Sequence, residues 1–329
     1  RKALGIDIVG IGTNWTIYGF ENTGWKTWHL PQGLEVEVPK DFVYTVDHIV
    51  HPGETIISKG MERFCGGKGL NQSIALAKAG ADVWHAGLIG LDGSVLKETL
   101  EQHGVHAEWV EQCEGANGHA LIQVDQSGQN SIVVYGGSNQ MITVKYMETV
   151  LSHFVPGDIL LLQNELNCTC EIMERAHKTG WKIALNPSPV SKELIDGPLE
   201  LADWLILNEI EGAQICGLPE NTQTNCVLSS LHRRFPKCAL VLTLGKNGGV
   251  YQDQNCMEKW DIWPVKAVDT TAAGDTFAGY FLAGAANGVP VKQVLKFASA
   301  ASALAVGRKG ASASIPYRNE VMDFVMKMQ

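Results

Sequence analysis

The chain of 329 residues lacks any apolar run close to the roughly 20 residues that a membrane-spanning helix needs. Its first residues, RKALGIDIVG, contain an apolar stretch too short for a secretory signal. Lysine and arginine form no cluster and the formal net charge is −9, which argues against a nucleic acid or an anionic membrane as a partner. We therefore expect a cytoplasmic protein that acts on small molecules.

Closely spaced cysteine pairs of the metal-binding kind are also missing. The eight cysteines are scattered, and Cys168 and Cys170 have no second pair at the spacing of a zinc site. We expect reduced thiols, because a chain of this size does not need disulfides to fold. Internal repeats, low-complexity tracts and a linker rich in Pro, Gly and Ser are absent, and 45% of the residues are apolar. One large domain over residues 1–329 is the simplest interpretation.

Two common nucleotide-binding motifs do not occur. Neither Gly67-Lys68 nor Gly245-Lys246 has the spacing of a P-loop. Gly10-Ile-Gly12 follows an apolar run, but Trp15 stands where the dinucleotide motif has its third glycine, and its side chain would block helix packing. The sequence thus disfavours a dehydrogenase, and any nucleotide must be held in another way.

Apolar β-branched runs alternate with helical patterns from about residue 74 onward, which predicts an α/β fold with a mostly parallel central sheet and helices on both faces. We expect helices at 71–80, 93–103, 143–152, 169–178, 208–216, 222–234, 273–287, 290–307 and 318–328. We expect strands at 82–89, 118–125, 130–135, 158–162, 181–185, 203–207, 238–243, 248–252 and 257–262. Two-residue alternation near 41–65 and 117–137 does not fit the main rhythm and predicts a small antiparallel β lid, with a turn around 126–129.

The segment VDTTAAGDTFA, residues 268–278, has the composition of an anion-binding turn before a helix. If a helix begins near Ala272, its first N–H groups lack intrahelical partners and can face a transferring phosphate. Asp275 would lie in that first turn, where negative charge is favoured and a carboxylate can take a proton from a hydroxyl. An ordinary capped turn between a strand and a helix would have a similar composition.

The segment CGGKGLNQSIALAKAGA, residues 65–81, places glycines and a lysine before an alanine-rich amphipathic helix. Gly67 and its neighbours allow close approach of a ligand to the backbone. Lys68 and Asn71 offer hydrogen-bond donors suited to a polyhydroxylated molecule.

These two segments together resemble the motifs of the ribokinase-like, or phosphofructokinase B, family of carbohydrate kinases. They occur in the usual order, about 200 residues apart, and the similarity covers most of the chain. The segments between and beyond them that share it include HPGETI at 51, NPSPV at 186, LNEIE at 207, LTLGKNGG at 242 and VGRKGASASIP at 306.

The resemblance implies ATP-dependent transfer of phosphate to a primary hydroxyl. Asp275 is then the base, and the N–H groups of Ala272, Ala273, Gly274 and Asp275 form the anion hole. The residues implied in sugar binding are Asp41, Gly67, Lys68, Asn71, Glu165 and Asn14. Residues 117–125 and 163–166 contain no Arg or Lys that could hold a second phosphate, which favours an unphosphorylated sugar.

The nucleotide side of the site is also implied by the resemblance. Asn208 and Glu211 match a motif associated with Mg²⁺ and phosphate through ordered water, which suits the preference of Mg²⁺ for carboxylate oxygens. A helix N-cap followed by a first-turn acid explains the same two residues. Thr243, Gly245 and Gly248 would border the nucleotide. A K⁺ site maps onto Asp269, Thr271, Ala305, Arg308, Gly310 and Ser314, and the lid is expected to form a homodimer surface.

The N-terminal residues depart from the family pattern. An Asn and an Asp normally hold the sugar in one short turn, but Pro39 stands at the Asn position before Asp41. Either residues 15–40 are an insertion that separates Asn14 from Asp41, with GIDIVGIG as the first strand, or the segment is a replacement in which 34–38 forms that strand. We favour the insertion.

The expected function is that of an ATP-dependent sugar kinase, with the ribose 5-hydroxyl as the favoured acceptor. Deoxyribose, a nucleoside or a keto-sugar acid are alternative substrates. A catalytically weak sugar-binding paralogue is the alternative of another class, although such a protein has no use for Asp275.

Overall fold

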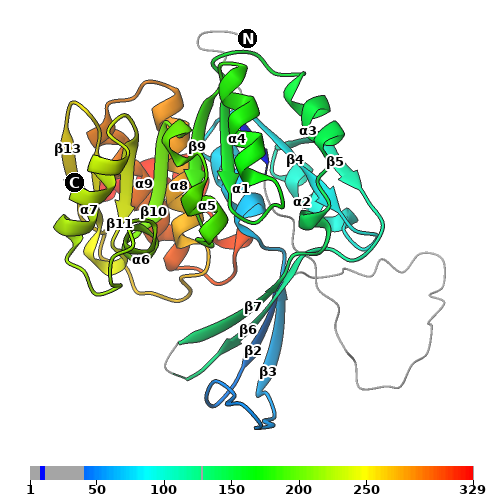
Figure 1. The fold of residues 1–329 in the computed structure, drawn as a ribbon. Coiled ribbons are helices and arrows are strands. Elements are labelled where there is room, and N and C mark those ends of the chain that lie inside the picture. Colours follow the sequence, from blue (N-terminus) through cyan, green and yellow to red (C-terminus); the bar gives the residue numbers. More distant parts are fainter. Residues whose placement is uncertain (1–7, 12–40, 127–128, 329) are drawn as a thin grey trace.

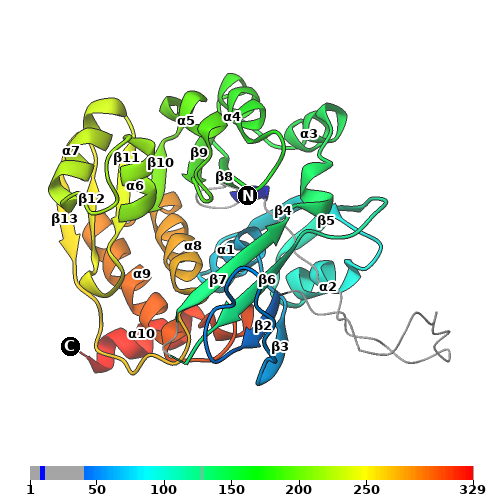
Figure 2. The same cartoon turned by 60° about the horizontal axis from the view of Figure 1, so that its bottom comes forward.

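The computed structural model describes residues 8–11, 41–126 and 129–328 (Figure 1). A nine-stranded sheet runs through the body in the order β13-β12-β11-β10-β9-β8-β1-β4-β5, and a separate four-stranded sheet has the order β3-β2-β6-β7. The smaller sheet projects from the body and leads directly into α1 (Figures 1 and 2). Within the described ranges, every helix is too short or too polar to traverse a bilayer.

The central sheet is parallel from β5 to β11, as predicted, and only the edge strands β12 and β13 are antiparallel. Its strands are β1 (Ile8–Ile11), β4 (Val83–Ile89), β5 (His106–Gln112), β8 (Ile159–Gln163), β9 (Lys182–Asn186), β10 (Trp204–Asn208), β11 (Ala239–Thr243), β12 (Gly249–Gln252) and β13 (Met257–Trp260). Most of them coincide with the predicted strands to within one or two residues.

Helices cover both faces of this sheet (Figure 1). One face carries α3 (Val144–Leu151), α4 (Thr169–Lys178), α5 (Lys192–Asp196), α6 (Glu209–Ile215) and α7 (Thr224–Arg234). The other carries α1 (Lys68–Lys78), α2 (Ser94–Gln102), α8 (Ala273–Ala286), α9 (Val291–Val306) and α10 (Arg318–Lys327). The side chains of strand β8 point alternately to the two faces. Leu160 and Leu162 pack under the first group of helices, while Ile159 and Leu161 pack under the second. A strand buried on both sides needs apolar residues at every position.

Strand β5 was not predicted. Its sequence HAEWVEQ has polar residues at most positions, and only Ala107 and Val110 are buried. β5 is the last strand of the sheet, and an edge strand with exposed charged residues carries a weak apolar signal.

The lid consists of β2 (Asp41–Thr45), β3 (Gly60–Phe64), β6 (His119–Val124) and β7 (Asn130–Tyr135). The pairs β2–β3 and β6–β7 are antiparallel hairpins, as expected, whereas the central pair β2–β6 is parallel. Each hairpin begins with the strand that leaves the body, so the two outgoing strands meet side by side in the same direction. The predicted antiparallel lid is thus present as two antiparallel hairpins, and its central pair is parallel.

Strand β1 lies in the middle of the main sheet, between β8 and β4, and is parallel to both. The predicted first strand in GIDIVGIG is thus present, as the insertion interpretation requires. Asn14 and residues 15–40, including the alternative strand at 34–38, lie outside the described residues. The backbone of Asp41 begins β2 at the root of the lid.

Candidate active site

Asp275 lies in the first turn of α8, and its side chain is buried. The helix begins after Ala272, and its first bond of the i to i−4 type runs from the N–H of Thr276 to the carbonyl of Ala272, at 2.9 Å. The N–H of Ala273 donates to Thr270 O at 3.2 Å. The amides of Gly274 and Asp275 come next and precede the regular helical bonding, at the positive end of the helix dipole.

Two amide side chains from α1 hold the Asp275 carboxylate. Asn71 Nδ2 donates to Oδ2 at 3.0 Å and Gln72 Nε2 donates to Oδ1 at 2.9 Å. This contact depends on close packing of α1 against α8, because a Cβ added at Gly279 would lie 2.4 Å from the Ala75 Cβ. Glycine at 279 therefore lets the two helices approach closely enough for both bonds.

Gln72 is itself fixed by a buried network that the sequence analysis missed. Its Oε1 accepts from Gln163 Nε2 at 2.7 Å, and its Nε2 also donates to Asn186 Oδ1 at 3.2 Å. Asn186 Nδ2 in turn donates to Ile206 O at 2.8 Å. The carboxylate is thereby linked through Gln72 to the central sheet.

A sequence signal for this network did exist. Four consecutive parallel strands, β8 to β11, each end in a polar residue after an apolar run: Gln163, Asn186, Asn208 and Thr243. The carboxyl ends of parallel strands meet at one edge of a sheet, where α/β proteins place their ligands. Gln163 and Asn186 directly follow the predicted strands 158–162 and 181–185, so reading the residue after each of these strands would have identified them.

A pocket opens at this edge of the sheet and joins residues predicted for both substrates. Its polar or small lining residues are Lys68, Asn186, Asn208, Glu211, Thr243, Thr271, Gly274 and Asp275. Of the remaining predicted residues, Asn71 reaches the site through its bond to Asp275. Gly67 is the N-cap of α1, with a φ of 107° that favours glycine.

Lys68, the first residue of α1, lies among three carboxylates. Burial alone would lower its pKa, but the charges of Asp275, Glu165 and Glu211 outweigh this effect and raise the pKa above its ordinary value. Glu165 follows the end of β8, and its carbonyl accepts from Gln140 Nε2 at 2.8 Å. Lys68 therefore carries a firm positive charge at the pocket wall.

Asn208 and Glu211 form a capping box at the start of α6. Asn208 Oδ1 accepts from the N–H of Glu211 at 2.9 Å, and Glu211 Oε2 accepts from the N–H of Asn208 at 3.0 Å. Both residues also line the pocket. The two interpretations of this motif are therefore compatible, because the cap orients the same side chains toward the pocket.

The glycines of LTLGKNGG have different surroundings. Gly245 begins a short 3₁₀ turn after β11, with a φ of 53°. Gly248 has a φ of 75°, and a Cβ there would lie 1.9 Å from the carbonyl oxygen of Trp260. Packing alone therefore requires glycine at 248, and a nucleotide role for this residue stays a prediction.

The segments predicted to surround K⁺ come together through Asp269. Its Oδ2 accepts from the N–H of Gly310 at 3.0 Å, and its Oδ1 accepts from the N–H of Thr271 at 2.9 Å. Partial burial raises the pKa of Asp269, but these bonds and the Thr271 hydroxyl prevail and lower it. Arg308 instead pairs with Glu320, while Ser314 Oγ donates to Ala311 O at 2.8 Å. Ala305 is buried in α9.

Comparison with known proteins identifies the family of this chain. The model of the pfkB family carbohydrate kinases matches residues 37–318. The ribokinase of Haemophilus influenzae is 33% identical over 294 residues, covering 87% of this chain and 95% of that protein. The ribokinase of Cryptococcus neoformans, solved with ADP, has a TM-score of 0.80 at 29% identity, covering 97% of this chain and 99% of the other. The ribokinase of Arabidopsis thaliana, complexed with ribose and ATP, has a TM-score of 0.75 at 26% identity and covers 98% and 99%. A match of this length to the family model, together with the pocket around Asp275, places the chain in the pfkB family of carbohydrate kinases.

Proposed function

We propose that this protein is a ribokinase, transferring the γ-phosphate of ATP to the 5-hydroxyl of ribose. The relatives described above are ribokinases, and one of their structures holds ribose and ATP. The observation that carries the proposal is the Asp275 carboxylate, held by Asn71 and Gln72 at the N-terminus of α8 and lining the pocket.

Asp275 acts as the general base in this proposal. One carboxylate oxygen takes the proton of the sugar hydroxyl as the hydroxyl oxygen bonds to the γ-phosphorus of ATP. The bond from this phosphorus to the bridging oxygen breaks, and ADP leaves. The hydrogen bonds from Asn71 and Gln72 keep the carboxylate in one orientation, so little reorganisation is needed during the reaction. The amides at the start of α8, from Ala272 to Asp275, are assigned to the charge of the transferring phosphate, for which the N–H of Ala273 has to release its bond to Thr270 O.

Sugar recognition is assigned to Gly67, Lys68, Asn71, Glu165 and Asp41, with Asn14 as the expected sixth member. The positive charge of Lys68 and the acceptor groups around it suit hydroxyls that need both donors and acceptors. A site that pairs each hydroxyl discriminates strongly against deoxy analogues, because its buried polar groups would be left without partners.

The nucleotide and its Mg²⁺ are assigned to Asn208, Glu211, Thr243, Gly245 and Gly248. A carboxylate beside a pocket for phosphates fits Mg²⁺, which keeps several waters and takes few protein ligands. Bound Mg²⁺ would neutralise phosphate charge, while the capping box fixes the direction of Glu211.

A monovalent cation, K⁺, is assigned to the loops joined by the Asp269–Gly310 hydrogen bond, with Thr271, Ala305, Arg308 and Ser314 as neighbours. We expect activity in K⁺ to exceed activity in Na⁺ or tetramethylammonium several-fold, since the cation site adjoins the start of α8. Initial rates at fixed ionic strength and fixed Mg²⁺ measure this. Equal rates in all three salts would remove the cation from the proposal.

A homodimer through the lid is the assembly that we propose. Strand β7 is an edge strand, and its residues Ile132, Val133, Val134 and Tyr135 are all more than half exposed. An uncovered edge with apolar side chains is a common surface for pairing with a second chain. Sedimentation equilibrium tests this assembly, and a monomer at micromolar concentration would contradict it.

The substrate assignment is tested by ADP release coupled to an indicator reaction. Ribose, deoxyribose, a panel of hexoses and keto-sugar acids, and nucleosides are compared at equal concentration with and without enzyme. We expect the largest kcat/KM with ribose. A larger kcat/KM with a nucleoside or another sugar would mean that the protein is a kinase for that substrate. No turnover with any acceptor would favour a sugar-binding paralogue without kinase activity.

A further inference from the structure

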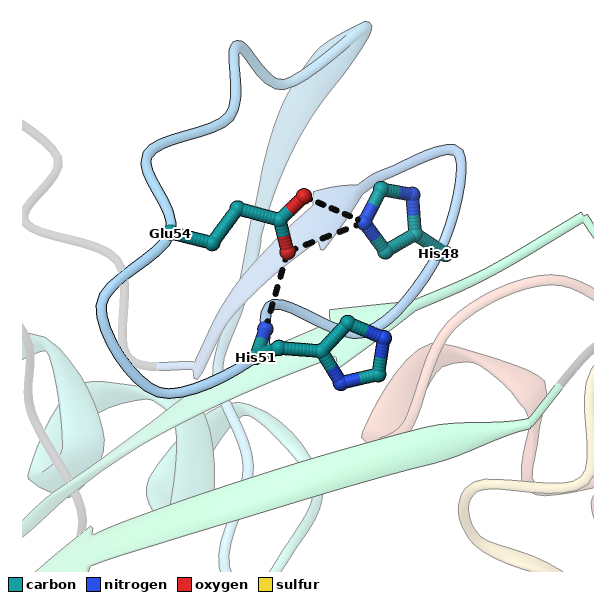
Figure 3. Close-up of side chains that lie close together, drawn as sticks. All are labelled: His48, His51 and Glu54. Atoms are coloured by element: carbon teal, nitrogen blue, oxygen red, sulfur yellow. Dashed lines mark hydrogen bonds and ion pairs between the residues drawn. The ribbon is translucent and has the colours of Figure 1, made fainter.

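The loop that joins β2 to β3, residues 46–59, brings together three side chains able to bind a metal: His48, His51 and Glu54 (Figure 3). His48 Nε2 lies 2.9 Å from Glu54 Oε1 and 3.0 Å from Glu54 Oε2. The backbone N–H of His51 donates to Glu54 Oε2 at 3.0 Å. One potential ligand atom from each of the three side chains lies within 4.8 Å of the other two.

The backbone of the loop creates this arrangement. Residues 51–54 form a turn in which the N–H of Glu54 donates to His51 O at 3.0 Å. Pro52 and Gly53, the latter with a φ of 83°, occupy the positions where such turns favour proline and glycine. The N–H of Val50 donates to Gln123 Oε1 at 3.0 Å, which ties the loop to β6. The three side chains are thus held close together by the fold itself.

The set of donors selects the kind of ion. Two imidazole nitrogens and one carboxylate suit Zn²⁺ and other late first-row divalent ions, whereas Mg²⁺ and Ca²⁺ prefer oxygen ligands. Tetrahedral zinc bonds of about 2.1 Å place two ligand atoms about 3.4 Å apart. The three ligand atoms lie within 4.8 Å of one another, so a pair has to close by at most about 1.4 Å, and all three side chains are exposed and can rotate.

We propose that His48, His51 and Glu54 bind one Zn²⁺ ion at the outer end of the lid, with water in the remaining coordination positions. Metal binding replaces the hydrogen bond between His48 and Glu54, and the Nε2 lone pair becomes available when the ring proton resides on Nδ1. The loop lies at the end of the lid remote from the body (Figure 1), so this site is separate from the pocket around Asp275.

The test is a titration of the full chain, free of any histidine tag, with Zn²⁺ after treatment with a chelator and a thiol reductant. Isothermal titration calorimetry gives the number of ions bound by wild type, His48→Gln, His51→Gln and Glu54→Gln. His153→Gln is the matched control, because His153 is an exposed histidine outside the loop. Its ring hydrogen-bonds to Thr149 O at 2.7 Å and Ser152 Oγ at 3.4 Å and lies against the Trp109 ring, with the centroids 4.2 Å apart. Circular dichroism confirms that each variant is folded.

We expect wild type and His153→Gln to bind one Zn²⁺ ion, and His48→Gln and His51→Gln to lose it. In Glu54→Gln the affinity for Zn²⁺ should fall at least tenfold. Excess Mg²⁺ should not change the Zn²⁺ binding of wild type. Equal stoichiometry in wild type and both histidine variants would overturn the site. Titration with Co²⁺ gives an independent readout. A visible ligand-field spectrum that disappears in the histidine variants supports the proposal, whereas a thiolate charge-transfer band that persists in them shows binding at cysteines and contradicts it.

Discussion

Replacing Asp275 with Asn is expected to lower kcat roughly 10²- to 10⁴-fold, the usual cost of losing a general base. The substitution removes proton acceptance and keeps the shape of the side chain. One carboxylate oxygen becomes an NH₂ group and meets the N–H of either Asn71 or Gln72. Asn71 Oδ1 is buried without a hydrogen-bond partner, so a flip of the Asn71 amide supplies an acceptor for the new group.

The Asp275→Asn protein should therefore remain folded and bind ribose and ATP nearly as wild type does. The coupled assay gives kcat, and calorimetry gives the two dissociation constants. Asp323→Asn, which removes an exposed carboxylate from α10, is the control for the loss of one negative charge. A variant at 275 that keeps more than half of the wild-type kcat would show that the base lies elsewhere.

Gly279→Ala should impair catalysis without touching either substrate. Its Cβ would lie 2.4 Å from the Ala75 Cβ and 2.9 Å from the backbone N of Leu76, whereas carbon atoms in contact are about 3.5–4.0 Å apart. Helices α1 and α8 must separate by roughly 1 Å, which moves Asn71 and Gln72 away from Asp275. A misplacement of that size can cost about 10²-fold in rate, and overpacking costs about 1–3 kcal/mol of stability.

Gly284→Ala is the matched control for that substitution. Gly284 lies on the same helix, and a Cβ there would approach Val294 Cγ2 of α9 to 2.9 Å, leaving the contact between α1 and α8 intact. We expect both variants to lose stability in urea denaturation, but only Gly279→Ala to lose kcat by more than tenfold. Similar kcat values for the two variants would mean that the carboxylate does not depend on close helix packing.

Much of this fold could be predicted because its strands are buried on both sides and its helices are amphipathic. The prediction failed where the pattern is weak or the information is not local. Strand β5 is an edge strand with polar residues at most positions, so its apolar pattern is weak. The parallel pairing of β2 with β6 depends on how two hairpins meet. Alternation along one strand cannot determine which strand lies next to it.

The residues of the site likewise fall into a group that the sequence predicts and a group that it does not. Lys68, Glu211, Thr243 and Asp275 come from distant segments with recognisable motifs, and all four line one pocket. The network of Gln72, Gln163 and Asn186 was missed because an amide at a strand end looks like any turn residue until the strand order is known.

Two hydrogen bonds of the site differ greatly in the length of chain that each one closes. The bond between Asp269 and Gly310 spans 41 residues, most of them in the neighbouring helices α8 and α9, whereas the bond between Asn71 and Asp275 spans 204 residues. Loop-closure entropy grows with the logarithm of length, so the longer closure costs about 1.4 kcal/mol more. The α8–α9 hairpin can therefore form early and locally during folding. The base reaches its amide partners only when α8 docks on α1, so the site is complete only once this long-range contact has formed.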